Sequence, residues 1–141
     1  MQARHVVPVL NVSDLSASFA WFAKLGWSKR WEWCPPGRTP SFGAVGSGEA
    51  EVFLCLNGQG GRGREGGVGG NGQGVWLSIW VDDVDDVHAV CLREQLEVIR
   101  EPRDEPWGVR ELHVRHPDGH TFRISQESHE HPHDDEHPHG H

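Results

Sequence analysis

The same order of predicted elements occurs twice along this chain, and this repeat constrains the fold more than any other feature. Each half begins with an apolar strand, continues with an aspartate that can cap a helix (Asp14 or Asp83), and then carries apolar residues at helical spacing. Three short strands follow each helix. The expected elements cover residues 6–12, 15–25, 27–33, 41–45 and 50–56 in the first half, and residues 75–81, 84–96, 98–101, 110–115 and 120–125 in the second. Neither half can bury its sheet alone, so the sequence predicts one α+β domain built from two βαβββ modules.

Two segments lie outside these modules. Residues 58–74 include ten glycines and are expected to form a flexible linker between module 5–57 and module 75–126, which together make a domain over residues 1–126. Residues 127–141 form an acidic, histidine-rich tail that is expected to be disordered. The tail is either simply solvated or a loose metal binder, since imidazole suits Zn, Ni and Cu. Its histidines are His129, His131, His133, His137, His139 and His141.

Charge and hydropathy exclude several classes of protein. The net charge is −8, which is opposite to that of a general nucleic-acid binder. Five acidic residues of the tail account for most of that charge, so the body is close to neutral. No apolar run is long enough to span a bilayer, and the first residues do not resemble a signal peptide. We therefore expect a cytoplasmic protein that binds neither nucleic acid nor membrane.

The seven tryptophans are the strongest functional signal, because the chain has no tyrosine at all. Strand alternation places Trp76, Ser78 and Trp80 on one face of the fifth expected strand, opposite its apolar residues. By the same period, Trp27, Trp31 and Trp33 share a face. Such indoles either complete the core or a subunit interface, or form a platform on which a planar or cationic ligand stacks.

Several motifs resemble the glyoxalase/bleomycin-resistance/dioxygenase superfamily, which has the vicinal oxygen chelate fold. They are the duplicated βαβββ order, the helix start at Val81-Asp82-Asp83-Val84, and the turn His116-Pro117-Asp118-Gly119. Val7-Pro8-Val9-Leu10, residues 76–81 and Glu105-Pro106-Trp107-Gly108 look more specifically like the bleomycin-resistance proteins. The resemblance implies a curved mixed sheet with a concave cleft.

The resemblance also implies where a metal would lie. Enzymes of the superfamily hold a divalent ion with side chains from the first, fourth, fifth and eighth strands. The matching positions here are Val7, Leu54, Trp76 and Arg123. None of these side chains is a metal ligand. We therefore expect no metal in the domain, no cofactor and no catalytic residue, and we expect His113, His116 and His120 not to form a metal site.

The resemblance nevertheless implies a binding site for a small molecule in the same cleft. In the bleomycin-resistance proteins, aromatic residues at positions matching Trp31 and Trp107 bracket the flat tail of the drug, and Phe42 could contribute from the following loop. Arg123 either contacts the ligand or pairs with a carboxylate, while Asp104 and Glu105 could attract a cationic group. The expected ligand-binding residues are Trp31, Phe42, Leu54, Trp76, Ser78, Trp80, Trp107 and Arg123.

The resemblance gives Pro8 a meaning as well. A proline in the first strand accompanies exchange of that strand between two subunits in the bleomycin-resistance proteins, so we expect a strand-exchanged homodimer. The leading hypothesis is a non-catalytic protein that sequesters a toxic small molecule such as a bleomycin-type glycopeptide. The alternatives are a metal-dependent lyase or dioxygenase of the same fold, and metal binding through the tail.

Overall fold

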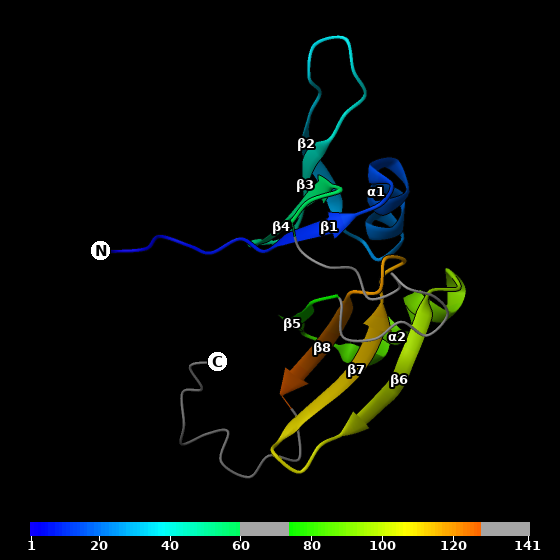
Figure 1. The fold of residues 1–141 in the computed structure, drawn as a ribbon. Coiled ribbons are helices and arrows are strands. Elements are labelled where there is room, and N and C mark those ends of the chain that lie inside the picture. The colour runs from blue at the N-terminus through cyan, green and yellow to red at the C-terminus, as the bar shows by residue number, and fades with distance from the viewer. Residues whose placement is uncertain (60–73, 128–141) are drawn as a thin grey trace.

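The computed structural model describes residues 1–59 and 74–127, and it contains the expected repeat of βαβββ modules (Figure 1). The first module consists of β1 (Val9–Val12), α1 (Leu15–Lys24), β2 (Ser28–Trp33), β3 (Phe42–Ser47) and β4 (Ala50–Leu56). The second consists of β5 (Trp76–Trp80), α2 (Val84–Arg93), β6 (Glu97–Asp104), β7 (Val109–Arg115) and β8 (Thr121–Glu127). The predicted α+β class and the order of the ten elements are confirmed.

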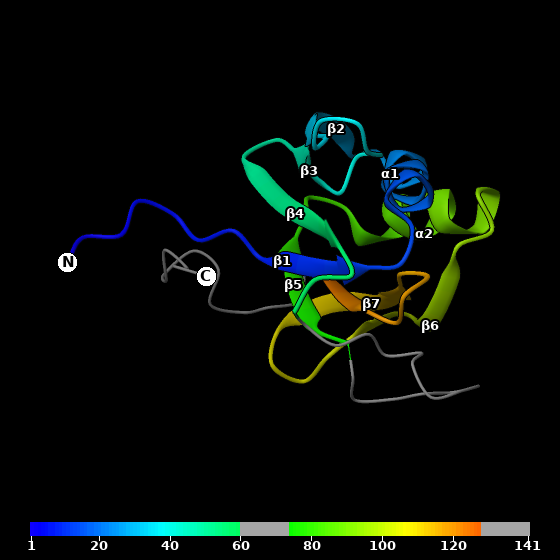
Figure 2. The same cartoon turned by 45° about the horizontal axis from the view of Figure 1, so that its top comes forward.

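Each module forms its own four-stranded mixed sheet. Sheet A has the order β1-β4-β3-β2 and sheet B the order β5-β8-β7-β6. In each sheet the first and last strands of the module pair in parallel, and the other neighbours are antiparallel. Each sheet therefore has one face toward a helix and one face without a helix, which we call the open face (Figure 2).

Both helices begin as the sequence predicts. The Asp14 carboxylate accepts a hydrogen bond from the Ala17 N–H at 2.9 Å, and the Asp83 carboxylate accepts one from the Asp86 N–H at 3.1 Å. Gly26 follows α1 with a φ of +97°, a conformation that glycine adopts at little cost. Helix α2 ends at Arg93, earlier than the expected end near residue 96.

The first strand begins later than expected. β1 starts at Val9, so Pro8 lies just before the strand and not inside it. β1 is an edge strand of sheet A, as the proline predicted, because a residue without an N–H cannot continue a ladder. Residues 1–7 extend away from the body in Figures 1 and 2, and Val6 is almost fully exposed.

One hydrophobic core joins the two modules. Phe22 of α1 and Phe122 of β8 are both fully buried, and their rings lie 5.6 Å apart. The same cluster contains Leu10 and Leu54 from sheet A and Leu112 from sheet B. Because residues of both halves complete each other's packing, the modules form one domain.

Two buried histidines reinforce this junction. The His116 imidazole lies 2.6 Å from the Ser18 hydroxyl of α1, and His120 Nε2 lies 2.8 Å from the carbonyl oxygen of Asn11 in β1. The Asp118 N–H donates to His116 Nδ1 at 3.0 Å, so Nε2 of His116 carries the proton and donates to Ser18. Burial, with a smaller effect of neighbouring His120, lowers the pKa of His116 to about 3.

The predictions for the linker, the tail and the domain boundary concern the ends of the described segments. Most of the expected glycine-rich linker and all six tail histidines lie outside the described residues. β8 runs one residue past the expected domain boundary at 126. Within the described residues, no helix is long and apolar enough to cross a bilayer.

Candidate functional site

The open face of sheet A carries a cluster of three aromatic rings, which we call the aromatic cluster. Trp31 of β2, Phe42 of β3 and Phe53 of β4 contact one another with ring centroids 5.2 to 5.6 Å apart. Trp31 stays partly exposed, whereas the residues that alternate with Phe53, Val52 and Leu54, are buried against the helix. The structure thus brings together two of the expected ligand-binding residues and adds Phe53, which the sequence analysis missed.

A β-bulge corrects the expected arrangement of the tryptophans in this sheet. Lys29 pairs with Val45 and Trp31 pairs with Ala44, so Arg30 is the extra residue and the period-two alternation breaks there. Trp27 therefore lies in the core, whereas Trp31 and Trp33 are exposed. The expectation that all three share a face is wrong, because it assumed an unbroken strand.

Sheet B presents a different open face. Trp76, Ser78 and Trp80 of β5 are exposed and alternate with the half-buried Leu77 and Ile79, as predicted. Trp76 is 66% exposed. Because β5 pairs in register with β8, Ser78 lies directly beside Arg123, with Trp76 and Trp80 on either side. The three expected ligand-binding residues of β5 therefore lie around Arg123, which is also an expected ligand-binding residue.

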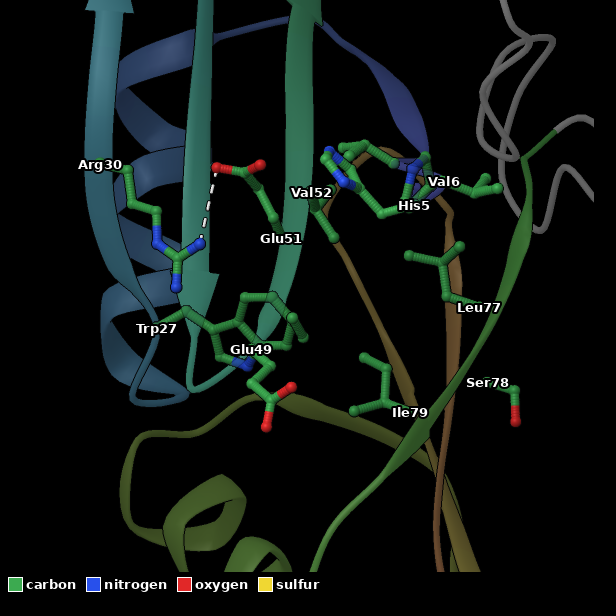
Figure 3. Close-up of a pocket in the computed structure, with 13 residues that line it drawn as sticks. His5, Val6, Trp27, Arg30, Glu49, Glu51, Val52, Leu77, Ser78 and Ile79 are labelled. Carbon is green, nitrogen blue, oxygen red and sulfur yellow. Dashed lines mark ion pairs between the residues drawn. The ribbon is translucent and has the colours of Figure 1, made fainter. Parts of the chain in front are cut away.

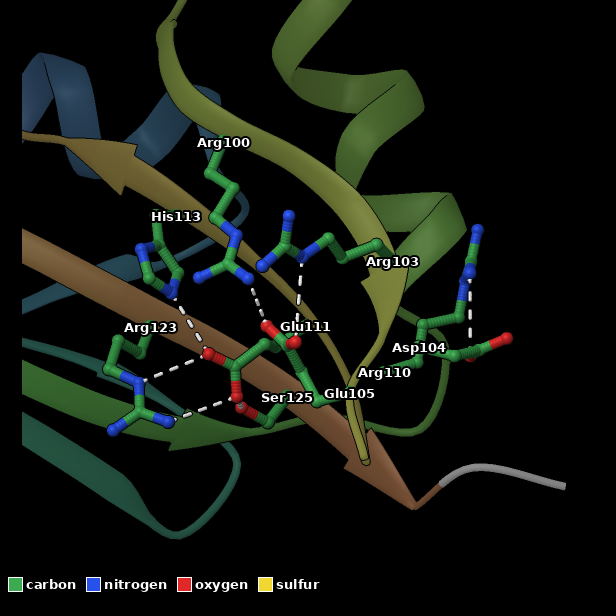
Figure 4. Close-up of polar contacts among 9 residues, drawn as sticks. All are labelled: Arg100, Arg103, Asp104, Glu105, Arg110, Glu111, His113, Arg123 and Ser125. Carbon is green, nitrogen blue, oxygen red and sulfur yellow. Dashed lines mark hydrogen bonds and ion pairs between the residues drawn. The ribbon is translucent and has the colours of Figure 1, made fainter. Parts of the chain in front are cut away.

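A buried carboxylate organises the middle of this face (Figure 4). Glu111 of β7 is only 1% exposed, and it accepts hydrogen bonds from Nε and Nη2 of Arg123 at 3.2 and 3.0 Å. His113 Nε2 lies 2.9 Å from the same carboxylate, and the Ser125 hydroxyl lies 3.4 Å from it. Burial would raise the pKa of Glu111, but the hydrogen bonds from Arg123 and His113 and their charges outweigh it and hold the pKa below its usual range. Arg123 therefore has a carboxylate partner, one of the two roles expected for it.

The two carboxylates expected to attract a cation are occupied by arginines. Glu105 is buried, and its oxygens lie 2.5 Å from Arg100 and 3.4 Å from Arg103. Asp104 lies 3.4 Å from Arg110, which also donates two hydrogen bonds to Asp85 of α2. Glu105 is therefore not presented to a ligand, whereas the Asp104 side chain is 54% exposed and is held, within the described residues, only by the contact with Arg110.

The remaining expected binding residues lie at different places. Trp107 occupies the turn between β6 and β7 and is largely exposed. Leu54 is fully buried in the core, on the face of sheet A opposite the aromatic cluster. A side chain buried there cannot contact a ligand on the open face. The residue of β4 on that face is the neighbouring Phe53.

Two of the cavities among the described residues lie at the edges of the sheets, outside these faces. The first has a volume of about 440 Å³ and lies between residues 5–8, the β3–β4 turn and β5. Figure 3 shows Leu77 and Ile79 pointing into it, while the Ser78 side chain points away. The second, of about 570 Å³, lies beside the start of α1 and Lys29 of β2. Both belong to the margins of the helix-facing side.

The sequence profile of the Glyoxalase/Bleomycin resistance protein/Dioxygenase superfamily matches residues 2–124, which include the first module and all of the second except the last three residues of β8. The chain belongs to this superfamily. Its name covers enzymes as well as resistance proteins, so membership alone does not assign an activity. A search of curated proteins found no significant match.

Solved structures share the fold of this superfamily member. TioX from Micromonospora sp. ML1 is 20% identical, with a TM-score of 0.71 over 89% of this chain and 99% of that chain. A superfamily member from Sphaerobacter thermophilus is 22% identical, with a TM-score of 0.64 over 87% of this chain and 98% of that one. A bleomycin resistance determinant encoded on the transposon Tn5 is 15% identical, with a TM-score of 0.67 over 89% of this chain and 98% of that one.

The residues that the resemblance placed at the superfamily's metal positions do not fit a metal ion. Val7 and Trp76 have no donor atom for a cation, Leu54 is in the core, and Arg123 is a cation bound to Glu111. Among residues 1–59 and 74–127, no three His, Cys, Asp or Glu side chains converge as a metal site. His113 lies on the open face, whereas His116 and His120 are buried with hydrogen bonds to the first module.

Proposed function

We propose that this protein binds a planar aromatic small molecule on its open faces without transforming it, and so sequesters a toxic compound. The observation that carries the proposal is the exposure of five tryptophans on or beside these faces, with Trp31 inside the aromatic cluster and Trp76 next to His113. They are Trp31, Trp33, Trp76, Trp80 and Trp107. Exposed indoles are costly in water and stack well on flat rings, so their exposure fits a surface kept for a ligand.

The identity of the ligand is suggested by the fold family. The superfamily includes bleomycin resistance proteins, and the fold matches the determinant encoded on Tn5. A bleomycin-type glycopeptide is therefore the first compound to test.

We also propose that the protein acts as a homodimer. Both β1 and β5 are edge strands, and residues 1–7 extend from the body beyond Pro8. Exchange of this segment between two subunits would cover an edge and bring the open faces of two copies together. Sedimentation of the full chain is expected to give a dimer mass, and deletion of residues 1–7 is expected to weaken the dimer. A monomer at micromolar concentration would refute this arrangement.

The binding proposal is tested by tryptophan fluorescence with the full chain. Titration with metal-free bleomycin is expected to quench the emission saturably at about one ligand per chain. Trp31→Leu or Trp76→Leu is expected to weaken binding by about fivefold, since stacking contacts are worth roughly 1 kcal/mol each. Trp27→Phe serves as the control, because Trp27 lies in the core. Absence of quenching in the wild type would exclude this ligand.

Divalent metals separate the proposal from its two alternatives. The same titration is made with Zn²⁺ and Mn²⁺ on the wild type and on a variant whose six tail histidines are alanine. Tight, stoichiometric binding that survives in the variant would favour a metal-dependent enzyme. Binding that requires the histidines would favour metal capture by the tail.

A further inference from the structure

Guanidinium groups are the outermost charges in the middle of the sheet B open face. The side chains of Arg100 and Arg123 are 29% and 33% exposed, whereas those of their partners Glu105 and Glu111 are only 3% and 2% exposed. Each carboxylate thus lies beneath the arginine that it holds. A ligand that approaches this face meets the cations first.

The strand register places four hydrogen-bonding side chains in one row across the sheet. Ser78 pairs with Arg123, Arg123 pairs with His113, and His113 pairs with Arg100. Cross-strand neighbours lie about 5 Å apart, so any two neighbours in the row are within the reach of one small ligand. Trp76 borders the row, and its ring lies 6.0 Å from the His113 ring.

The hydrogen bonds within the row leave donors for a ligand. Nε and Nη2 of Arg123 donate hydrogen bonds to the Glu111 carboxylate. Because the guanidinium is planar, Nη1 then points away from Glu111 (Figure 4). Arg100 contacts Glu105 through Nη2. Both arginines are held in place by their carboxylates, so they lose little side-chain freedom when they bind.

Other charges near the row favour the same sign of ligand. Arg103 also lies beside Glu105, and Arg115 is on the same face as His113. Glu97 lies opposite Arg115, and Glu127 lies at the far end of β8, so both carboxylates are at the margins of the face. A cationic group over the row would face two arginines, whereas a carboxylate would accept hydrogen bonds from them.

We propose that this row is a subsite for an anionic oxygen group, above all a carboxylate, on the planar ligand, with the ligand's ring stacked on Trp76. The proposal rests on the planar-ligand binding proposed above and specifies the ligand's chemistry. It assigns an acidic group to the ligand, whereas the sequence had left open that Asp104 and Glu105 could attract a cationic one.

The test compares two probes of the same shape, 2-naphthoate and its neutral analogue 2-naphthamide. Both are titrated into the full chain while the seven tryptophan indole N–H signals are followed by NMR. We expect 2-naphthoate to bind about tenfold more tightly, with a preference that shrinks as salt is added, and to shift the signal of Trp76. Equal affinity would overturn the anionic subsite but leave stacking intact. Failure of both probes to bind would overturn both proposals.

Three variants locate the preference. Arg100→Gln leaves Glu105 beside Arg103 and is expected to reduce the carboxylate preference about threefold or more. Arg123→Gln alone could leave the buried Glu111 without a cation, so the double variant Arg123→Gln with Glu111→Gln replaces the pair by two amides that can hydrogen-bond. It is expected to reduce the preference to the part that Arg100 supplies, about threefold, while 2-naphthamide still binds. Arg93→Gln, on the exposed side of α2, is the matched control and is expected to change neither affinity. A preference that is unchanged in the double variant would refute the subsite.

Discussion

The open faces of the two sheets differ although the modules repeat the same element order. Sheet A presents the aromatic cluster of Trp31, Phe42 and Phe53, whereas sheet B presents arginines that lie over the buried Glu105 and Glu111. The two modules therefore share an apolar sheet face that packs on a helix, but they differ in the residues of their open faces. One fold thus presents an aromatic cluster on one sheet and arginine–carboxylate pairs beside exposed tryptophans on the other, and each feature can be removed separately.

Acidification is expected to have the largest effect on the free energy of unfolding. It protonates the buried His116, whose hydrogen bond to Ser18 helps to join the two modules in one domain. The unfolded chain protonates His116 near pH 6.5, whereas the folded chain resists protonation down to about pH 3. The unfolded state therefore binds more protons in this window, and stability falls as the pH falls from 6.5 to 3. The full loss is on the order of 5 kcal/mol, at about 1.4 kcal/mol per pH unit.

Urea denaturation between pH 7 and pH 4 checks this expectation. The variant His116→Gln keeps a polar group beside Ser18 but does not titrate, so it is expected to be less stable at pH 7 and less sensitive to acid. If the variant and the wild type lost stability in parallel, His116 would not be the source of the acid sensitivity.

A pair of glycine substitutions in β3 tests what supports the aromatic face. A Cβ at Gly43 would lie 2.5 Å from the Phe19 ring and 3.0 Å from the Trp31 carbonyl oxygen, so Gly43→Ala must displace either α1 or β2. We expect a loss of about 1–3 kcal/mol by thermal unfolding, as for other overpacked sites. Gly46→Ala is the control, since its Cβ meets only the flexible end of Arg30. Equal losses of stability for both variants would show that β3 tolerates no added side chain at either position, whatever the Cβ contacts.

Most of the fold could be predicted from local signals. Asp14 and Asp83 marked the starts of both helices, and the Pro117-Asp118-Gly119 turn fixed the last hairpin, where Gly119 has a φ of +92°. The faces of sheet A could not be predicted, because the bulge at Arg30 depends on how β2 and β3 pair, and no turn signal marks it.

The carboxylate partner of Arg123 in the candidate site, Glu111, was missed for a related reason. Glu111 and His113 are two residues apart on one strand of a hairpin, and Arg123 and Ser125 are two residues apart on the other. The hairpin turn fixes their register, so Glu111 opposite Ser125 and His113 opposite Arg123 could have been inferred. That Glu111 lies buried beneath Arg123 depends on long-range packing, which the sequence pattern does not contain.

A double-mutant cycle measures the ionic character of the sheet B face. Stabilities of the wild type, Glu111→Gln, Arg123→Gln and the double variant are compared by urea denaturation at pH 7. We expect a coupling energy of about 1–2 kcal/mol, reduced from the value of a fully buried pair because a third of the Arg123 side chain is exposed. Coupling below about 0.5 kcal/mol would show that the network is held by packing and not by charge.

Sheet A supplies the matched ion pair, for which the smallest effect is expected. Arg30 and Glu51 lie 3.6 Å apart, and both side chains keep at least a quarter of their surface in water. Water competes for both groups and salt screens them, so the same cycle with Arg30→Gln and Glu51→Gln is expected to give less than about 0.5 kcal/mol. If this pair coupled as strongly as Glu111 and Arg123, burial of the carboxylate would not explain the strength of the sheet B network. A weak pair here and a strong pair there would show that the two faces differ in energetics as well as in composition.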